Sequence, residues 1–337
     1  MKKILLLLTL LPIGAFSQTI NSVQNGDFFN PFTWDCACIP QNGMTVNIDH
    51  DVVLNLDIAY TSGSIIINSG ASLIEDATDR AFWVDGTGTL TNNGTFTSHL
   101  LLVSPNADIT NTGNMPNLDS VWVQGTLTNS GFISALDVLN DETSNFDNQS
   151  EVSIANNFNN QGYFYIAPSA SVEVGNDFSN CNLQTLYAYM ENDGIMCITN
   201  DFSNCPDDTL DGQGNYYVGG SSSNLGVFTG DFTFHTPSGT MGVPGTIDPS
   251  VTVTSGTCTL GMTEQNEQQV QVAPNPVSDL LQLSIDSGKF ALFDITGKMI
   301  FSGYFYNGSI DFSSINSGIY LLKINDNKTI RITKAQH

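Results

Sequence analysis

The chain has 337 residues and a net charge of −24, and its charged residues are divided unevenly along its length. Residues 18–269 contain 28 acidic residues and a single basic residue, Arg80, whereas residues 270–337 contain six basic and five acidic residues. A segment this acidic repels phosphate backbones and anionic lipids, which excludes nucleic acids and membrane surfaces as its partners. Calcium is its natural counter-ion, although such a charge also serves simply to keep a surface protein soluble.

A signal peptide is predicted over residues 1–17. Lys2 and Lys3 precede an apolar run from Ile4 to Leu11, and Ala15-Phe16-Ser17 is a small-x-small cleavage signal. The run is too short to cross a bilayer, and no later segment approaches the ~18 apolar residues that a spanning helix needs. We therefore expect export from the cytoplasm and no membrane-spanning segment in the mature protein.

The segment that follows carries a first resemblance. It reads Thr-Trp-Asp-Cys-Ala-Cys-Ile-Pro at 33–40, Met-Thr-Val-Asn-Ile at 44–48 and His-Asp-Val-Val-Leu at 50–54. These motifs resemble the first coil of β-helical surface proteins exported by the type IX secretion system. The resemblance implies a β-helix that starts close to the N-terminus of the mature chain.

Internal repeats predict the architecture of residues 18–260. Gly-Thr-Leu-Thr-Asn-Asn-Gly at 88–94 recurs almost unchanged at 125–131, and Asn-Asp-Phe-Ser-Asn-Cys at 176–181 recurs at 200–205. Between the repeats, Val, Ile and Phe alternate with polar residues, as in half-buried strands. We predict a right-handed parallel β-helix of about ten coils stacked about 4.8 Å apart. The alternative is a chain of small β-sandwich domains, which would show longer strands and more regular turns.

Glycine and asparagine mark the corners between the predicted strands. Asn-x-Gly sequences end at Gly70, Gly94, Gly113, Gly131, Gly162 and Gly194. We expect these corners to need the positive φ that glycine adopts without strain. The asparagines could also stack as ladders that stabilise the rod.

Six cysteines in an exported chain indicate disulfides rather than reactive thiols. Cys181 and Cys205 occupy the same place in neighbouring copies of one repeat, so stacked coils would bring them within disulfide range. If Cys36 and Cys38 bridge each other, Cys197 is left for Cys258. Six cysteines allow 15 connectivities, so the sequence alone leaves other pairings open.

A calcium turn is a candidate at residues 207–212, Asp-Asp-Thr-Leu-Asp-Gly. The spacing partly follows an EF-hand loop, but the twelfth position is Val218 where a bidentate glutamate is required, and no helices flank it. An EF-hand is therefore excluded. Asp207, Asp208 and Asp211 remain candidate ligands of an irregular calcium turn, with an ordinary solvated loop as the alternative, and no other cofactor is predicted.

Catalysis has little support in the sequence, and no catalytic residue is assigned. A lyase that abstracts a proton with a basic side chain would have only Arg80 available. An inverting glycosidase needs just two carboxylates about 6.5–9.5 Å apart, a requirement that so many acids meet too easily to identify a pair. Asp49-His50-Asp51 could orient a histidine base, yet no Gly-x-Ser-x-Gly sequence supplies a nucleophile.

Paired aromatic residues favour binding over catalysis. In a strand, one member of Phe82-Trp83, Tyr163-Phe164-Tyr165 or Tyr216-Tyr217 must face outward, where it could stack on a sugar ring. We therefore expect a non-catalytic rod of the adhesin or matrix type that contacts glycans or other surface proteins. A secreted carbohydrate-active hydrolase using two aspartates is the alternative.

The last 66 residues carry the most specific resemblance. Ala-Pro-Asn-Pro at 273–276 is followed by Phe-Asp-Ile-Thr-Gly-Lys at 293–298 and Ser-Gly-Ile-Tyr-Leu-Leu-Lys-Ile at 317–324. Their order and spacing resemble the type A C-terminal sorting domain of type IX secretion cargo. The motif positions are Pro274, Asn275, Pro276, Asp294, Gly297, Lys298, Gly318 and Tyr320.

The resemblance implies a fate for the whole chain. It implies transport across an outer membrane by the type IX machinery, removal of the tail by a sortase-like protease, and release or attachment at the cell surface. The alternating segments between residues 280 and 333 predict an antiparallel β-sandwich, with a hairpin turn at Thr296-Gly297. We thus predict a passenger over 18–260, a polar linker over 261–270 and a sorting domain over 271–337.

Overall fold

A computed structural model describes residues 18–258 and 272–335, apart from residues 77, 183–185, 286–287, 295–297, 306–307 and 325–327. The chain divides into two compact units, with the division after Cys258. The predicted signal peptide, the predicted linker and the predicted turn at Thr296-Gly297 lie outside the described residues. Within these residues the one helical element is a 3₁₀ turn, η1, at Pro31–Thr33, so the fold is all-β as predicted.

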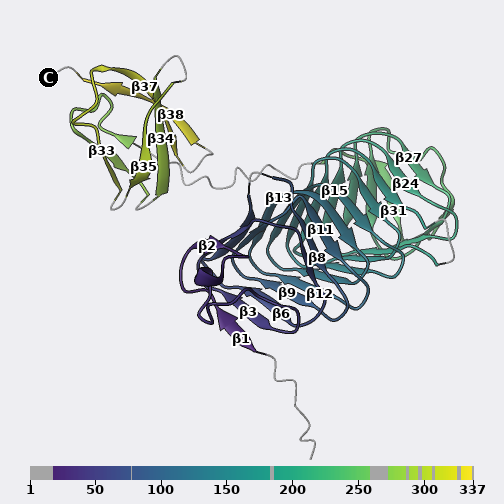
Figure 1. The fold of residues 1–337 in the computed structure, drawn as a ribbon. Coiled ribbons are helices and arrows are strands. Elements are labelled where there is room, and N and C mark those ends of the chain that lie inside the picture. The colour runs from purple at the N-terminus through teal and green to yellow at the C-terminus, as the bar shows by residue number, and fades with distance from the viewer. Residues whose placement is uncertain are drawn as a thin grey trace, which may run out of the picture. The chain divides into compact units, whose positions relative to one another are not determined.

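The first unit is a parallel β-solenoid, in which each coil stacks on the one before it (Figure 1). Strand pairing is parallel throughout its three faces, so the predicted coil stack is confirmed and a chain of sandwich domains is excluded. The first face is a separate twelve-stranded sheet. Its strands, in stacking order, are β1 (Thr19–Asn21), β3 (Thr45–Ile48), β6 (Ser64–Ile67), β9 (Thr89–Asn92), β12 (Asp108–Asn111), β14 (Thr126–Asn129), β16 (Asn145–Asn148), β19 (Tyr163–Ile166), β22 (Tyr189–Asn192), β25 (Thr209–Asp211), β28 (Val227–Phe228) and β30 (Thr246–Ile247).

The second and third faces belong to one 19-stranded sheet, because the long strands β13 (Asn114–Val123) and β15 (Phe132–Asn140) run through both. The second face also contains β2 (Gly26–Asp27), β4 (Asp51–Leu54), β7 (Ser72–Glu75), β10 (Thr95–Thr97), β17 (Glu151–Ile154), β20 (Ser171–Val174), β23 (Ile195–Ile198), β26 (Asn215–Val218), β29 (Thr233–Thr236) and β31 (Thr252–Ser255). The third face also contains β5 (Ile58–Tyr60), β8 (Ala81–Val84), β11 (Leu100–Val103), β18 (Phe158–Asn160), β21 (Phe178–Asn180), β24 (Phe202–Asn204) and β27 (Ser222–Asn224).

Alternation within the short strands produces a single apolar core. The inward positions carry Val, Ile, Leu and Phe, which are almost fully buried. Phenylalanines from successive coils touch one another: the ring centroids of Phe158 and Phe178 are 5.3 Å apart, and those of Phe178 and Phe202 are 5.9 Å apart. Since a coil has no core of its own, this stacking is what makes the passenger a stable unit.

Two buried asparagine ladders run along the corners of the solenoid, as the repeats suggested. In one, Asn92, Asn111, Asn129 and Asn148 are linked by amide–amide hydrogen bonds of 2.8–2.9 Å. In the other, Asn140, Asn160, Asn180, Asn204 and Asn224 are linked by bonds of 2.7–2.8 Å. Most rungs also donate to a backbone carbonyl, so these fully buried amides satisfy the turns around them.

The positive φ expected for the corner glycines is found at only one of the six Asn-x-Gly positions. Gly70 has a φ of +84°, whereas the other five do not lie in the left-handed region. At Gly131 an added Cβ would instead collide with the carbonyl oxygen of Gly113, which is the corresponding glycine one coil earlier. The corners therefore require glycine mainly because neighbouring coils approach one another closely.

The second unit consists of two small antiparallel sheets around its own core, as predicted. One sheet contains β32 (Val272–Ala273), β33 (Leu280–Leu283) and β36 (Ser309–Asp311), and the other contains β34 (Gly288–Asp294), β35 (Met299–Phe305), β37 (Gly318–Ile324) and β38 (Lys328–Lys334). Leu281, Leu292, Leu322 and Ile332 are fully buried between them.

Candidate functional site

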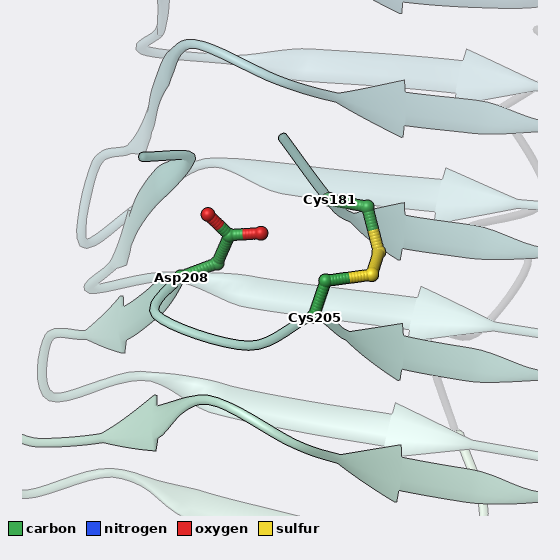
Figure 2. Close-up of side chains that lie close together, drawn as sticks. All are labelled: Cys181, Cys205 and Asp208. Carbon is green, nitrogen blue, oxygen red and sulfur yellow. A yellow bond between two sulfur atoms is a disulfide. The ribbon is translucent and has the colours of Figure 1, made fainter. Parts of the chain in front are cut away.

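All six cysteines are paired, and the pairing is the one considered from the sequence. Cys36–Cys38, Cys181–Cys205 and Cys197–Cys258 have Cα–Cα distances of 5.1, 4.9 and 5.7 Å. The Cys181–Cys205 bridge joins equivalent positions of stacked coils (Figure 2). No cysteine remains free, so the cysteines cross-link the passenger and supply neither a nucleophile nor thiolate ligands.

Asp208 lies beside this disulfide, on the turn that follows Cys205 (Figure 2). Its fully buried carboxylate accepts the backbone N–H groups of Asn182 at 2.9 Å and of Ala188 at 2.8 Å. Burial raises the pKa of the Asp208 carboxyl, and these two hydrogen bonds oppose the rise. The carboxylate and the two sulfur atoms are close enough to hold a metal ion, but sulfurs joined in a disulfide are not thiolate ligands.

The three carboxylates proposed for calcium face different partners. Asp207 is exposed, with a φ of +69°, whereas Asp208 is buried. Asp211 accepts the Tyr189 hydroxyl at 2.6 Å and the Gly212 N–H at 2.7 Å. In the described part of the chain these three do not form a close cluster of ligand atoms. Calcium binding stays a prediction, which calorimetric titration with calcium chloride would check.

Other acids on the first face gather with tyrosines. Tyr163 donates to Glu191 at 2.9 Å, and Tyr165 donates to Asp193 at 3.3 Å. The Tyr163 and Tyr189 rings stack on each other nearly in parallel, with centroids 5.8 Å apart and planes 13° apart. Burial, together with the Glu191 carboxylate, raises the pKa of Tyr163. Beside these rings is an open hollow lined by Glu191, Asp193, Asp211, Gln213, Asp231 and Asp248.

A row of apolar side chains runs across the outer side of the third face. Strand register aligns Trp83 with Leu102, Leu102 with Trp122, and Trp122 with Leu139. Trp83 is 38% exposed, while the preceding residue, Phe82, is fully buried, which confirms that one aromatic of this pair faces outward. We call Trp83, Leu102, Trp122 and Leu139 the apolar ridge.

Polar groups border the apolar ridge on both sides. At the corner before the strands, His99 Nδ1 lies 2.8 Å from an Asp119 carboxylate oxygen and 3.9 Å from Asp79. At the opposite end of the strands, the Asp141 carboxylate accepts the Trp122 indole N–H at 3.1 Å and the Gln124 amide at 3.0 Å. This border therefore contains carboxylates, an imidazole and an amide.

The sequence did not reveal the His99–Asp119 pair, because these residues lie 20 positions apart. The signal was nonetheless present, since the chain advances by about that number of residues in each coil at this point: Leu100 is in register with Ser120. The histidine that the sequence did single out, His50, contacts the Ser22 hydroxyl at 2.9 Å. Of its two neighbours, Asp49 accepts the Asn68 side-chain amide at 2.7 Å and Asp51 accepts the Ser72 hydroxyl at 2.9 Å.

The motif positions of the tail hold the ends of its strands in place. In the exposed run Pro274–Pro276, the Asn275 side chain donates to the Arg331 carbonyl at 2.8 Å and accepts the Thr333 N–H at 2.8 Å. These two bonds attach the start of the domain to its last strand. Gly297 lies outside the described residues.

The remaining motif positions act in the same way. Asp294 and Lys298 close the β34–β35 hairpin through two bonds, since the Asp294 N–H donates to the Lys298 carbonyl at 3.0 Å and the Lys298 N–H donates to the Asp294 carboxylate at 3.1 Å. The Tyr320 hydroxyl donates to the Asn316 carbonyl at 2.9 Å, and Gly318 packs against the Tyr320 ring. The tail motif thus marks structural positions of one particular sandwich.

Comparison with known proteins identifies this sandwich. Residues 271–336 match the family model described as the secretion system C-terminal sorting domain. No curated protein and no solved structure matches the chain. Among the described residues, no helix has the length and apolar character needed to cross a membrane. The chain is therefore cargo of the type IX secretion system, a β-solenoid passenger whose C-terminal sorting domain directs it to the cell surface or to secretion.

Proposed function

We propose that the passenger is a non-catalytic binding rod of the adhesin or matrix type, which contacts glycans on its outer surface. The observation that carries this proposal is the apolar ridge, a row of exposed or partly exposed tryptophan and leucine side chains on an acidic passenger. The interior is filled with apolar side chains and asparagine ladders, so any ligand is expected to contact the faces. We also propose that a sortase-like protease removes the tail within the linker, residues 261–270.

A secreted hydrolase is the second candidate, and the acidic hollow on the first face is the observation in its favour. Its carboxylates are largely engaged: Asp193 accepts Tyr165 and the Gln213 N–H, and Asp211 accepts Tyr189. A general acid for glycoside cleavage needs a raised pKa beside the sugar. Asp208 has a raised pKa, but it is fully buried and bonded to the backbone. We therefore favour binding.

The test of this proposal records binding and cleavage in one assay. Purified protein is incubated with neutral and acidic polysaccharides, and both retention on the polymer and release of reducing ends are measured. We expect retention on neutral polymers, weaker retention on polyuronates because the passenger is acidic, and no new reducing ends. Release of ends that Asp193→Asn or Asp231→Asn abolishes would instead establish the hydrolase and place its site in the hollow.

A further inference from the structure

We propose that the apolar ridge binds an extended, neutral, β-linked glycan chain, which lies across the coils along the axis of the solenoid. This inference rests on the proposed function and assigns it a site and a ligand class. The two indoles come from the first and third of three consecutive coils, with Leu102 between them. Two strand spacings separate them, or about 9.6 Å. That distance is comparable with the length of one disaccharide unit in an extended chain.

The ridge has the chemistry that a pyranose ring requires. The C–H face of such a ring is apolar and packs on an indole or a leucine side chain, while its hydroxyl groups point outward from the ring edge. Trp122 is held in place, because its N–H donates to Asp141 and its ring is only partly exposed. A fixed aromatic side chain loses little conformational entropy on binding.

Groups that bond hydroxyls are present on both sides of the ridge. Asp141 also accepts the Gln124 amide, and although burial raises the pKa of the Asp141 carboxyl, hydrogen bonds from Gln124, the Glu142 N–H and Trp122 hold it below the ordinary value. The carboxyl is therefore ionised near neutral pH and acts as an acceptor only. Asp119, paired with His99 and half-exposed, offers a second acceptor at the opposite border.

Among polymers of similar shape, the negative charge of the passenger favours a neutral ligand at the apolar ridge. Carboxylates at the borders accept hydrogen bonds from sugar hydroxyls, but they repel the carboxylates and sulfates of anionic glycans. Only one basic residue, Arg80, is present in residues 18–269, and its guanidinium is occupied by Asp76 at 2.7 and 3.0 Å. A neutral chain is therefore the complementary partner.

The first face is a poorer site for the same ligand. Its most regular aromatic pair, Tyr163 and Tyr189, is stacked ring on ring, and both hydroxyls are bonded to carboxylates. Tyr187 lies two residues before β22 and is 68% exposed. It provides a matched control for loss of an exposed aromatic outside the ridge.

The test measures the affinity of the full secreted chain for cello- and chito-oligosaccharides by calorimetry. We expect Trp83→Ala and Trp122→Ala each to weaken binding by about tenfold, Trp122→Phe to restore most of it, and Tyr187→Ala to leave it unchanged. Melting curves of each variant serve as a folding control, and Trp83→Ala is informative even if Trp122→Ala fails to fold, because Trp83 is more exposed.

Each result decides one of the two proposals. Equal affinity of the wild type and both tryptophan variants for a neutral oligosaccharide would overturn the ridge as the site, while leaving glycan binding intact. Absence of binding to neutral oligosaccharides, together with retention on bacterial cells or surface proteins, would overturn the ligand class. Tighter binding of a polyuronate than of the neutral chains would overturn the charge argument.

Discussion

Asn180→Asp is expected to lower the free energy of unfolding by about 3–5 kcal/mol at neutral pH. In the wild type, the fully buried Asn180 amide donates to the Asn204 side-chain oxygen at 2.7 Å and to the Thr209 carbonyl at 3.2 Å. A carboxylate has no donor to offer, so two oxygen acceptors would face a buried negative charge. The introduced carboxylate would keep only the hydrogen bond that the Asn160 amide donates, at 2.7 Å in the wild type.

The loss of stability in Asn180→Asp should also depend on pH, and the direction of that dependence follows from the pKa of the introduced carboxyl. Burial and facing acceptors raise the pKa of the introduced carboxyl in the folded state above its unfolded value of about 3.9. The folded variant then takes up its proton at a higher pH than the unfolded chain does, so its stability relative to the wild type should recover as the pH falls through the raised pKa. Urea unfolding at several pH values measures this recovery.

Asn159→Asp is the matched control for this experiment. Asn159 lies in β18, next to the ladder residue Asn160, but its side chain is exposed and accepts the Ser179 hydroxyl at 2.7 Å. A carboxylate can accept that bond equally well, so we expect a change within about 0.5 kcal/mol. Equal stability of Asn180→Asp and the wild type at neutral pH would show that the ladder contributes little to the solenoid.

Deletion of residues 271–337 is expected to abolish export across the outer membrane and retain the passenger in the periplasm. The two units have separate cores, and all three disulfides lie within residues 18–258, so the deletion leaves the interior of the passenger intact. Retention would thus reflect loss of the sorting domain rather than misfolding. Immunoblots of periplasmic, surface and medium fractions measure the distribution.

The reciprocal fusion is the control for the deletion. Residues 261–337 attached to an unrelated periplasmic protein should carry it to the surface or the medium, because the domain folds around its own core. Asn275→Ala in that fusion removes the two bonds that join the start of the domain to β38, and we expect weaker export. Normal export of the truncated chain would contradict the sorting role of the tail.

The repeats predicted the fold because each coil repeats the same physical requirements. Asn176-Asp177-Phe178 and its copy at 200–202 stack in register, with Phe178 aligned to Phe202, as the near-identical sequences required. The Cys181–Cys205 bridge followed from the same alignment. Features repeated along the chain could therefore be placed before the structure was known.

Features that depend on the contact between coils were harder to predict. The corner glycines were interpreted through their own backbone angles, yet Gly131 is required by the carbonyl group of Gly113 in the preceding coil. Asp208 was interpreted as part of a local turn, whereas its partners Asn182 and Ala188 lie 26 and 20 residues away. The apolar ridge was only partly foreseen, because its alignment depends on register across four coils.

Tryptophan fluorescence provides the most direct test of glycan binding at the apolar ridge. The chain has three tryptophans, and only two of them belong to the ridge. Trp34 is buried, with 2% of its surface exposed, so quenching by acrylamide reports mainly on Trp83 and Trp122. We predict that a saturating neutral oligosaccharide protects both indoles from acrylamide and releases no reducing ends. If calorimetry shows binding of the same oligosaccharide while quenching stays unchanged, the ligand lies elsewhere and the apolar ridge is not the glycan site.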